Sequence, residues 1–159
     1  AKAAGNSAAS FYRTSQPKEL GFDQVLWTDI TDDYKLEELG SANFFYVKNG
    51  ALYTPKMRDS ILNGITRNTV INLAKESGLE VHEEAISSDR IKSELAAGDV
   101  NCLFATGTAA AITYINELQI DGELFQVNSN TYAPIVQIKQ DLDDCKFGLK
   151  NHEDWNVWV

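Results

Sequence analysis

The feature that most constrains the fold of this chain is an Asn-Gly pair between two apolar runs. Asn49 and Gly50 separate the segment Asn43 to Lys48 from the segment Ala51 to Thr54. Asn-Gly between such segments is a strong local signal for a two-residue hairpin turn. We therefore predict two antiparallel strands joined at this point, with Pro55 ending the second strand.

Further strands and helices are predicted on both sides of this hairpin. The expected strands are Gln24 to Thr28 (buried), Tyr34 to Leu39, Leu79 to Ala85, Val100 to Ala105 and Ala109 to Ile115. The expected helices are Ser7 to Leu20, Arg67 to Ser77, Ser88 to Ala97 and Thr131 to Asp144. Gly21, Gly78 and Gly98 are suitable helix terminators, and Asp121-Gly122 turns the chain back. This mixed order predicts an α+β domain, with a mixed or antiparallel sheet or pseudo-barrel flanked by helices.

Length and composition exclude several classes of protein. The 159 residues are 43% hydrophobic, which predicts one folded domain spanning residues 1–159. The net charge of −9 argues against a nucleic-acid surface, because phosphate binding normally requires a basic face. No apolar run reaches the roughly 20 residues that span a bilayer, so we expect no membrane partner and a cytoplasmic protein. Cys102 and Cys145 lie far apart, which predicts buried free thiols and no metal site.

Lys2 is the one residue near the start of the chain suited to covalent chemistry. A lysine amine can serve as both nucleophile and base, although a lysine near a terminus is more often a solvated charge. The chain opens on Ala1-Lys2, and its only methionine is Met57. We therefore expect a fragment of a longer protein.

Two turns have residues suited to binding an anion. Gly64-Ile65-Thr66 precedes a predicted helix, whose first N–H groups and dipole favour an anion, although simple capping by Thr66 is the alternative. Thr106-Gly107-Thr108-Ala109 breaks a buried strand and combines hydroxyl groups with a glycine that allows close backbone approach. A purely structural turn is the alternative for this second segment.

The adjacent carboxylates Glu37 and Glu38 lead out of a predicted strand into a Gly-Ser turn. Neighbouring residues on a strand point to opposite faces, so we expect at most one of them to face a given site. A buried carboxylate against a ring nitrogen would keep that nitrogen protonated. Exposure of both side chains at the surface is the alternative.

These stretches resemble, in the same order, those of branched-chain amino acid aminotransferases, which are fold-type IV pyridoxal phosphate enzymes. The resemblance covers essentially the whole chain but only the C-terminal, larger domain of the family, so the N-terminal domain is expected to be missing. The matching stretches are Lys2 to Asn6, Asp23 to Trp27, Glu38 to Phe45, Gly64 to Arg67, Thr106 to Ala110 and Asp154 to Val159.

The resemblance implies a role for each matching residue at pyridoxal 5'-phosphate. Lys2 would form the internal aldimine and then move the proton between the substrate α-carbon and the cofactor. Glu38 would bind the pyridine nitrogen, within a Glu-Leu-Gly-Ser motif that also places Ser41 at the cofactor. Leu62 would pack on the face of the ring.

By the same resemblance, Gly64, Ile65 and Thr66 together with Thr108 would hold the phosphate. Thr108 and Ala109 would offer backbone N–H groups to the substrate carboxylate. Ser7 stands where family members usually have a tyrosine whose hydroxyl contacts the cofactor oxygen. Ser7 is too short for that contact without a bridging water, which implies reduced activity or a shifted substrate range.

The implied reaction moves an amino group between leucine, isoleucine or valine and 2-oxoglutarate, in a homodimer. The missing N-terminal domain would supply an arginine for the phosphate and much of the substrate pocket, so we expect the fragment alone to be inactive. Two rival activities of the same fold type are those of D-amino acid aminotransferase and aminodeoxychorismate lyase. A non-catalytic homologue is the rival from a different class.

Overall fold

The predicted hairpin lies at the centre of a seven-stranded sheet in the computed structural model, which describes residues 17–40 and 42–149. Its strands are β3 (Ala42–Lys48) and β4 (Ala51–Pro55), which pair antiparallel. Asn49 and Gly50 have φ values of 48° and 82°, as a two-residue hairpin turn requires. The hairpin prediction is therefore confirmed.

The long strand β3 organises the rest of the sheet. One edge of β3 pairs along its length with β6 (Val100–Gly107). The other edge pairs first with β2 (Lys35–Leu39) and then with β4. The outer strands are β1 (Leu26–Asp29) beside β2, β5 (Val81–Glu84) beside β4, and β7 (Ala111–Ile115) beside β6. Only the β4–β5 pair is parallel among the described strands, so the expected mixed, mainly antiparallel α+β fold is confirmed.

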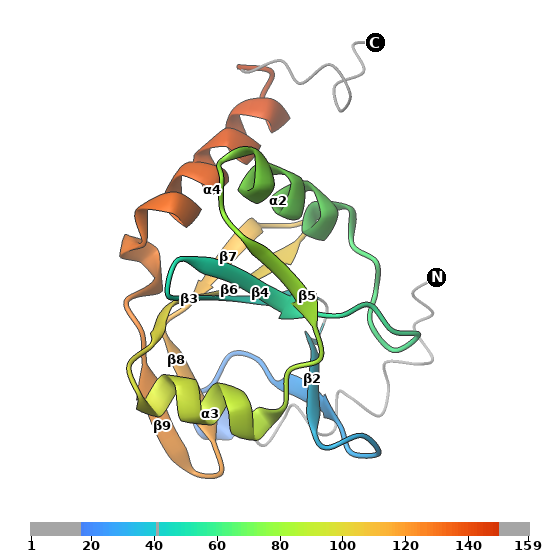
Figure 1. Ribbon diagram of the computed structural model, residues 1–159, viewed down its shortest axis with the longest axis vertical. Coiled ribbons are helices and arrows are strands. Elements are labelled where there is room, and N and C mark those ends of the chain that lie inside the picture. The colour runs from blue at the N-terminus through green and yellow to red at the C-terminus, as the bar shows by residue number, and fades with distance from the viewer. Residues whose placement is uncertain (1–16, 41, 150–159) are drawn as a thin grey trace.

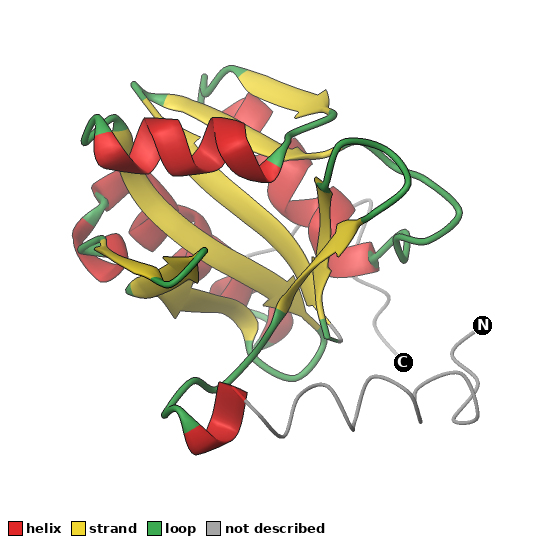
Figure 2. Cartoon of the chain, turned by 90° about the horizontal axis from the view of Figure 1, so that it is seen from below, coloured by secondary structure: helices red, strands yellow, loops and turns green. Residues whose placement is uncertain are grey.

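Helices cover both faces of this sheet. The helices α2 (Ile65–Glu76) and α4 (Ala133–Lys146) lie on one face (Figure 1). The helix α3 (Ser88–Ala96) and a hairpin of β8 (Glu117–Ile120) and β9 (Glu123–Gln126) lie on the other. Seen from below, α3 crosses in front of the strands (Figure 2).

This arrangement explains the apolar run in β3. Phe45 and Val47 belong to the core cluster beneath α2 and α4, whereas Phe44 and Tyr46 belong to the cluster beneath α3. Successive side chains of a strand point to opposite faces, so a strand buried on both faces reads as continuously apolar.

Glycine ends α2 and α3 as predicted. At the end of α2, Gly78 has a φ of 81°, its N–H donates to the Lys75 carbonyl, and the Leu79 N–H donates to the Ala74 carbonyl. Gly98 ends α3 with the same pair of bonds. This is the Schellman arrangement, in which positive φ favours glycine.

Several predicted strand boundaries and environments were wrong. The strand predicted at Gln24 to Thr28 begins only at Leu26. It is half-buried because, among the described strands, it pairs only with β2. The predicted break at Thr106 to Thr108 comes later, because β6 continues to Gly107 and pairs there with Ala111.

Helix boundaries also differ from the predictions. The helix expected from Arg67 begins at Ile65, and the last helix runs from Ala133 to Lys146 rather than from Thr131 to Asp144. A short 3₁₀ turn, Ser129–Thr131, precedes it. Of the first predicted helix, the structure describes only residues 17–20, and 17–19 are helical. The strands β8 and β9 were not predicted; only the turn between them was.

The two cysteines differ in their surroundings. Cys102 is a buried free thiol, as expected, whereas Cys145 is only half-buried, so the expectation of burial was wrong for Cys145. Burial raises the pKa of the Cys102 thiol to about 12. Among the described residues, no helix is both long and apolar enough to cross a membrane.

We expect Phe45→Ala to lower the free energy of unfolding by about 3–5 kcal/mol, because it removes a fully buried ring and leaves a cavity. Phe45 stacks on Phe104 with ring centroids 5.0 Å apart. Denaturant unfolding measures the change. The matched control is Phe147→Ala, whose ring is 70% exposed and whose loss should cost about 0.5 kcal/mol or less. Similar losses for the two variants would contradict the assigned core.

Candidate active site

Three polar residues lie side by side where β2, β3 and β6 meet. Asn43 on β3 is directly opposite Glu38 on β2 and Thr106 on β6. Residues directly opposite one another on neighbouring strands project to the same face. Asn43 and Thr106 are buried and Glu38 is half-buried, so a polar row borders an otherwise apolar core at this end of the sheet.

Asn43 and Glu38 hold the segment that leads into α2. The Asn43 Nδ2 donates to the Leu62 carbonyl at 2.8 Å, and the Leu62 N–H donates to Glu38 Oε2 at 3.2 Å. A Cβ added at Gly64 would lie 2.3 Å from Asn43 Oδ1, so only glycine fits this close approach. Leu62 and Gly64 are therefore fixed against β2 and β3.

The helix α2 begins directly after this segment. Gly64 is the N-cap residue, and within the described chain no side chain caps the helix. The first turn holds no acidic residue, and its leading N–H groups have no acceptor within the helix. Capping by Thr66 is therefore wrong as an explanation of the Gly-Ile-Thr turn. The opening of α2 is suited to an anion.

Arg67 anchors the first turn of α2 to the sheet. This arginine is 1% exposed, and its Nη2 donates to the Pro55 carbonyl at 3.1 Å and to Glu83 at 2.9 Å. A cation in the first turn is unfavourable with respect to the helix dipole, but the paired guanidinium fastens α2 to the ends of β4 and β5.

The turn between β6 and β7 lies at the same end of the sheet. Thr106 is opposite Asn43, and Thr108 follows two residues later, a chain length of roughly 7 Å. The hydroxyl of Thr106 is buried and has no hydrogen-bond partner among the described residues. Buried hydroxyl groups are normally bonded, so this group marks a place where a ligand or a water completes the site.

The predicted site residues fall into three groups. Contacts bring Glu38, Leu62 and Gly64 together, and the chain places Ile65 and Thr66 immediately after them. Register alone places Thr108 and Ala109, both exposed, near this group. The predicted residues Lys2 and Ser41, together with Ser7, lie outside the described residues.

Both adjacent glutamates contact the loop of residues 56–64 between β4 and α2. Glu38 accepts from Leu62, and Glu37 accepts a hydrogen bond from the Ser60 hydroxyl. The two carboxylates are half-buried, so the interpretation of both as fully exposed surface charges is wrong. The loop passes the end of β2 closely enough to meet both side chains.

The sequence did not predict the roles of Asn43 and Arg67. Asn43 is the one polar residue at the start of an apolar strand, and this was the available signal. Arg67 stands one turn before the apolar face of α2, where a buried guanidinium is unusual.

Comparison with known proteins identifies the family. The profile described as "Amino-transferase class IV" matches residues 3–118, which is most of the chain. The chain belongs to the class IV aminotransferases.

Similar relatives and solved structures agree on this fold. A probable branched-chain-amino-acid aminotransferase of Staphylococcus aureus is 40% identical over 160 residues, covering 99% of this chain and 44% of its own length. The branched-chain amino acid aminotransferase from Escherichia coli has a TM-score of 0.73 and 32% identity, covering 98% of this chain and 49% of the other. An aminotransferase from Brucella abortus bound to the cofactor PLP has a TM-score of 0.63 and 26% identity, covering 81% and 41%. The chain thus spans less than half the length of these proteins.

We expect Gly64→Ala to lower the free energy of unfolding by about 1–3 kcal/mol, because its methyl group would overlap the Asn43 amide. Gly64 has a φ of −71°, which alanine adopts easily, so backbone strain is not involved. Asn43→Ala makes room for the methyl group but loses the bond to Leu62.

Denaturant unfolding of both single variants and the double variant tests this contact. The double variant should be less destabilised than the sum of the single effects, by at least about 0.5 kcal/mol. Strict additivity would show that Gly64 and Asn43 are not packed against each other.

Proposed function

We propose that the chain is the cofactor-binding domain of an aminotransferase that uses pyridoxal 5'-phosphate. The reaction moves an amino group between leucine, isoleucine or valine and 2-oxoglutarate. The supporting observation is that Glu38, Leu62 and the opening of α2 are held together in a chain 40% identical to a probable branched-chain-amino-acid aminotransferase.

The described residues fit this cofactor. The segment Leu62 to Gly64 lies between a carboxylate, Glu38, and the N-terminus of α2. A flat ring with a nitrogen at one end and a phosphate at the other requires partners of these two kinds. The Thr106 hydroxyl, which has no partner among the described residues, adds a polar group at the same end of the sheet.

When bound, the cofactor supplies an electron sink for the substrate α-carbon. Glu38 holds a proton at the ring nitrogen, and the half-exposed Leu62 offers an apolar surface to the ring. The N–H groups of Ile65 and Thr66 and the hydroxyl of Thr108 hold the phosphate. Ser41 would also contribute to holding the cofactor.

Lys2 carries the covalent attachment and the proton transfer in this proposal. Its amine would hold the cofactor covalently and would act as the acid and base at the substrate α-carbon. The backbone N–H groups of Thr108 and Ala109 hold the substrate carboxylate in place. Orientation by these groups keeps the α-hydrogen within reach of the amine.

Residues outside this chain would complete the enzyme. Because the chain covers only 44% of a curated relative, we propose that a further N-terminal domain supplies an arginine for the phosphate and part of the pocket, and that the 159 residues alone are inactive. We also propose a homodimer in the cytoplasm, a location with which the free thiol of Cys102 agrees. The experiments below use the gene product that contains residues 1–159, here called the full-length protein.

We expect Lys2→Ala in the full-length protein to abolish the visible absorbance of lysine-bound cofactor and to lower turnover of leucine with 2-oxoglutarate at least about 100-fold. Lys18→Ala, which removes an exposed lysine, is the matched control and should change neither quantity. Absorbance spectra after addition of pyridoxal phosphate, with a coupled assay, measure both effects.

Absence of this absorbance in the unaltered full-length protein would contradict the proposed cofactor and favour the non-catalytic homologue. Its persistence in Lys2→Ala would show that another lysine binds the cofactor.

Substrate preference separates the proposal from its rivals within the fold type. We expect the full-length protein to transaminate leucine, isoleucine and valine with kcat/KM at least about 100-fold above that for D-alanine, because its relatives are branched-chain aminotransferases. Preference for D-alanine would indicate a D-amino acid aminotransferase. Release of pyruvate from aminodeoxychorismate would indicate the lyase.

A further inference from the structure

The loop of residues 56–64 carries Leu62 and Gly64 into the site, and an arginine fastens it to a distant turn. We propose that Arg58 is a positioning residue, which sets the cofactor-facing position of Leu62 by binding two carboxylates, one at the end of β1 and one in the turn that follows it. The inference rests on the proposed function, since it assigns Leu62 to the cofactor ring.

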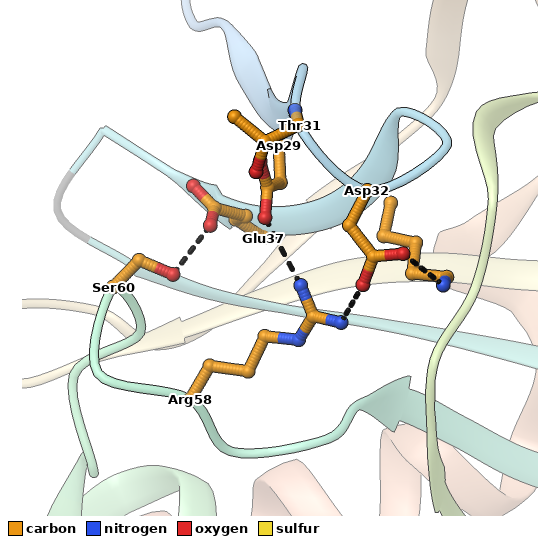
Figure 3. A network of polar contacts seen from close by, with 7 residues as sticks. Asp29, Thr31, Asp32, Glu37, Arg58 and Ser60 are labelled. Carbon is orange, nitrogen blue, oxygen red and sulfur yellow. Dashed lines mark hydrogen bonds and ion pairs between the residues drawn. The ribbon is translucent and has the colours of Figure 1, made fainter.

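The clasp joins one guanidinium to two carboxylates. Arg58 Nη1 donates to Asp29 Oδ2 at 3.1 Å, and Nη2 donates to Asp32 Oδ2. Figure 3 shows the guanidinium between these two side chains. Hydrogen bonds from Lys35 and Arg58 hold the pKa of Asp32 below its usual range. A planar fork that meets two acceptors fixes direction as well as distance.

The turn after β1, which contains Asp32, is itself held by hydrogen bonds. Asp33 and Tyr34 have φ values of 56° and 47°, and the Lys35 N–H donates to the Asp32 carbonyl, as in a tight two-residue turn. The Tyr34 carbonyl accepts from the Ser88 N–H at the start of α3. Arg58 therefore binds a fixed support rather than a free loop.

The same arginine closes the turn that delivers Leu62. The Arg58 carbonyl accepts from the Ile61 N–H at 3.1 Å, and the Ile61 side chain is buried. Next along the chain, the Leu62 N–H reaches Glu38. Ser60 donates a further hydrogen bond to Glu37. The ion pairs of Arg58, the turn closed by its carbonyl and the contact of Leu62 with Glu38 therefore follow one another along the chain.

Loss of the clasp should loosen Leu62 without removing any group that touches the cofactor. We expect Arg58→Ala to weaken pyridoxal phosphate binding to the full-length protein about fivefold, the effect that a partly exposed ion-pair network supports. In the cofactor-free protein, the backbone amide of Leu62 should exchange its hydrogen faster. Arg58→Lys keeps the charge but not the planar guanidinium with two donors, so its effects should lie between those of the unaltered protein and Arg58→Ala.

Arg90 offers a matched control. It also binds two carboxylates, Glu84 and Glu94, and its side chain is 34% exposed, against 33% for Arg58. Arg90→Ala should lower the unfolding midpoint while leaving cofactor affinity and Leu62 exchange unchanged within about twofold.

The experiment is a cofactor titration, amide exchange and thermal unfolding on the unaltered protein and the three variants. Weaker binding and faster Leu62 exchange in Arg58→Ala, but not in Arg90→Ala, support the positioning role. Equal changes in both alanine variants, or a change in unfolding alone, overturn it. If Arg58→Ala does not fold, unchanged binding and exchange in Arg58→Lys overturn it as well. No cofactor binding by the unaltered protein refutes the proposed function instead, and the exchange data still show whether Arg58 orders the loop.

Discussion

The site depends on one buried amide. Asn43 lies on the strand that holds the sheet together, and its side chain binds the carbonyl of Leu62 while pressing against Gly64. An unbonded amide buried at this position would cost about 1–3 kcal/mol, so sheet and loop are energetically linked. Because α2 starts directly after Gly64, this contact also fixes where the N-terminus of the helix points.

Charge is arranged around that contact in a consistent way. Carboxylates from β1, β2 and their turn meet the loop on one side, through Glu38 and Arg58. The opening of α2 on the other side has no acidic residue, and its first turn contains the buried Arg67. The side with the carboxylates thus suits a protonated ring nitrogen, and the opening of α2 suits a phosphate. A single loop separates them.

Local chemistry made much of the fold predictable from sequence. Asn49-Gly50 and the helix-ending glycines act through their own backbone conformations, so no knowledge of distant residues was needed. The half-burial of β1 depends on which strands flank it, and the local sequence does not contain that information. Membership of the class IV aminotransferases was recognisable from the order of the matching segments.

Contacts between distant residues explain what the sequence did not predict. Asn43 acts on Leu62, 19 residues later, and Arg58 acts on Asp29, 29 residues earlier. The residue type does not predict such a partner, because asparagine and arginine are usually found at the surface. Only the fold brings the loop of residues 56–64 against β1, β2 and β3, where these contacts form.

The most direct measurement is a crystal structure of the full-length protein with pyridoxal 5'-phosphate. We expect the phosphate to accept hydrogen bonds from the N–H groups of Ile65 and Thr66, with the ring nitrogen at Glu38 and Leu62 against the ring. A phosphate bound away from the opening of α2, or a ring nitrogen without contact to Glu38, would contradict the proposed cofactor site.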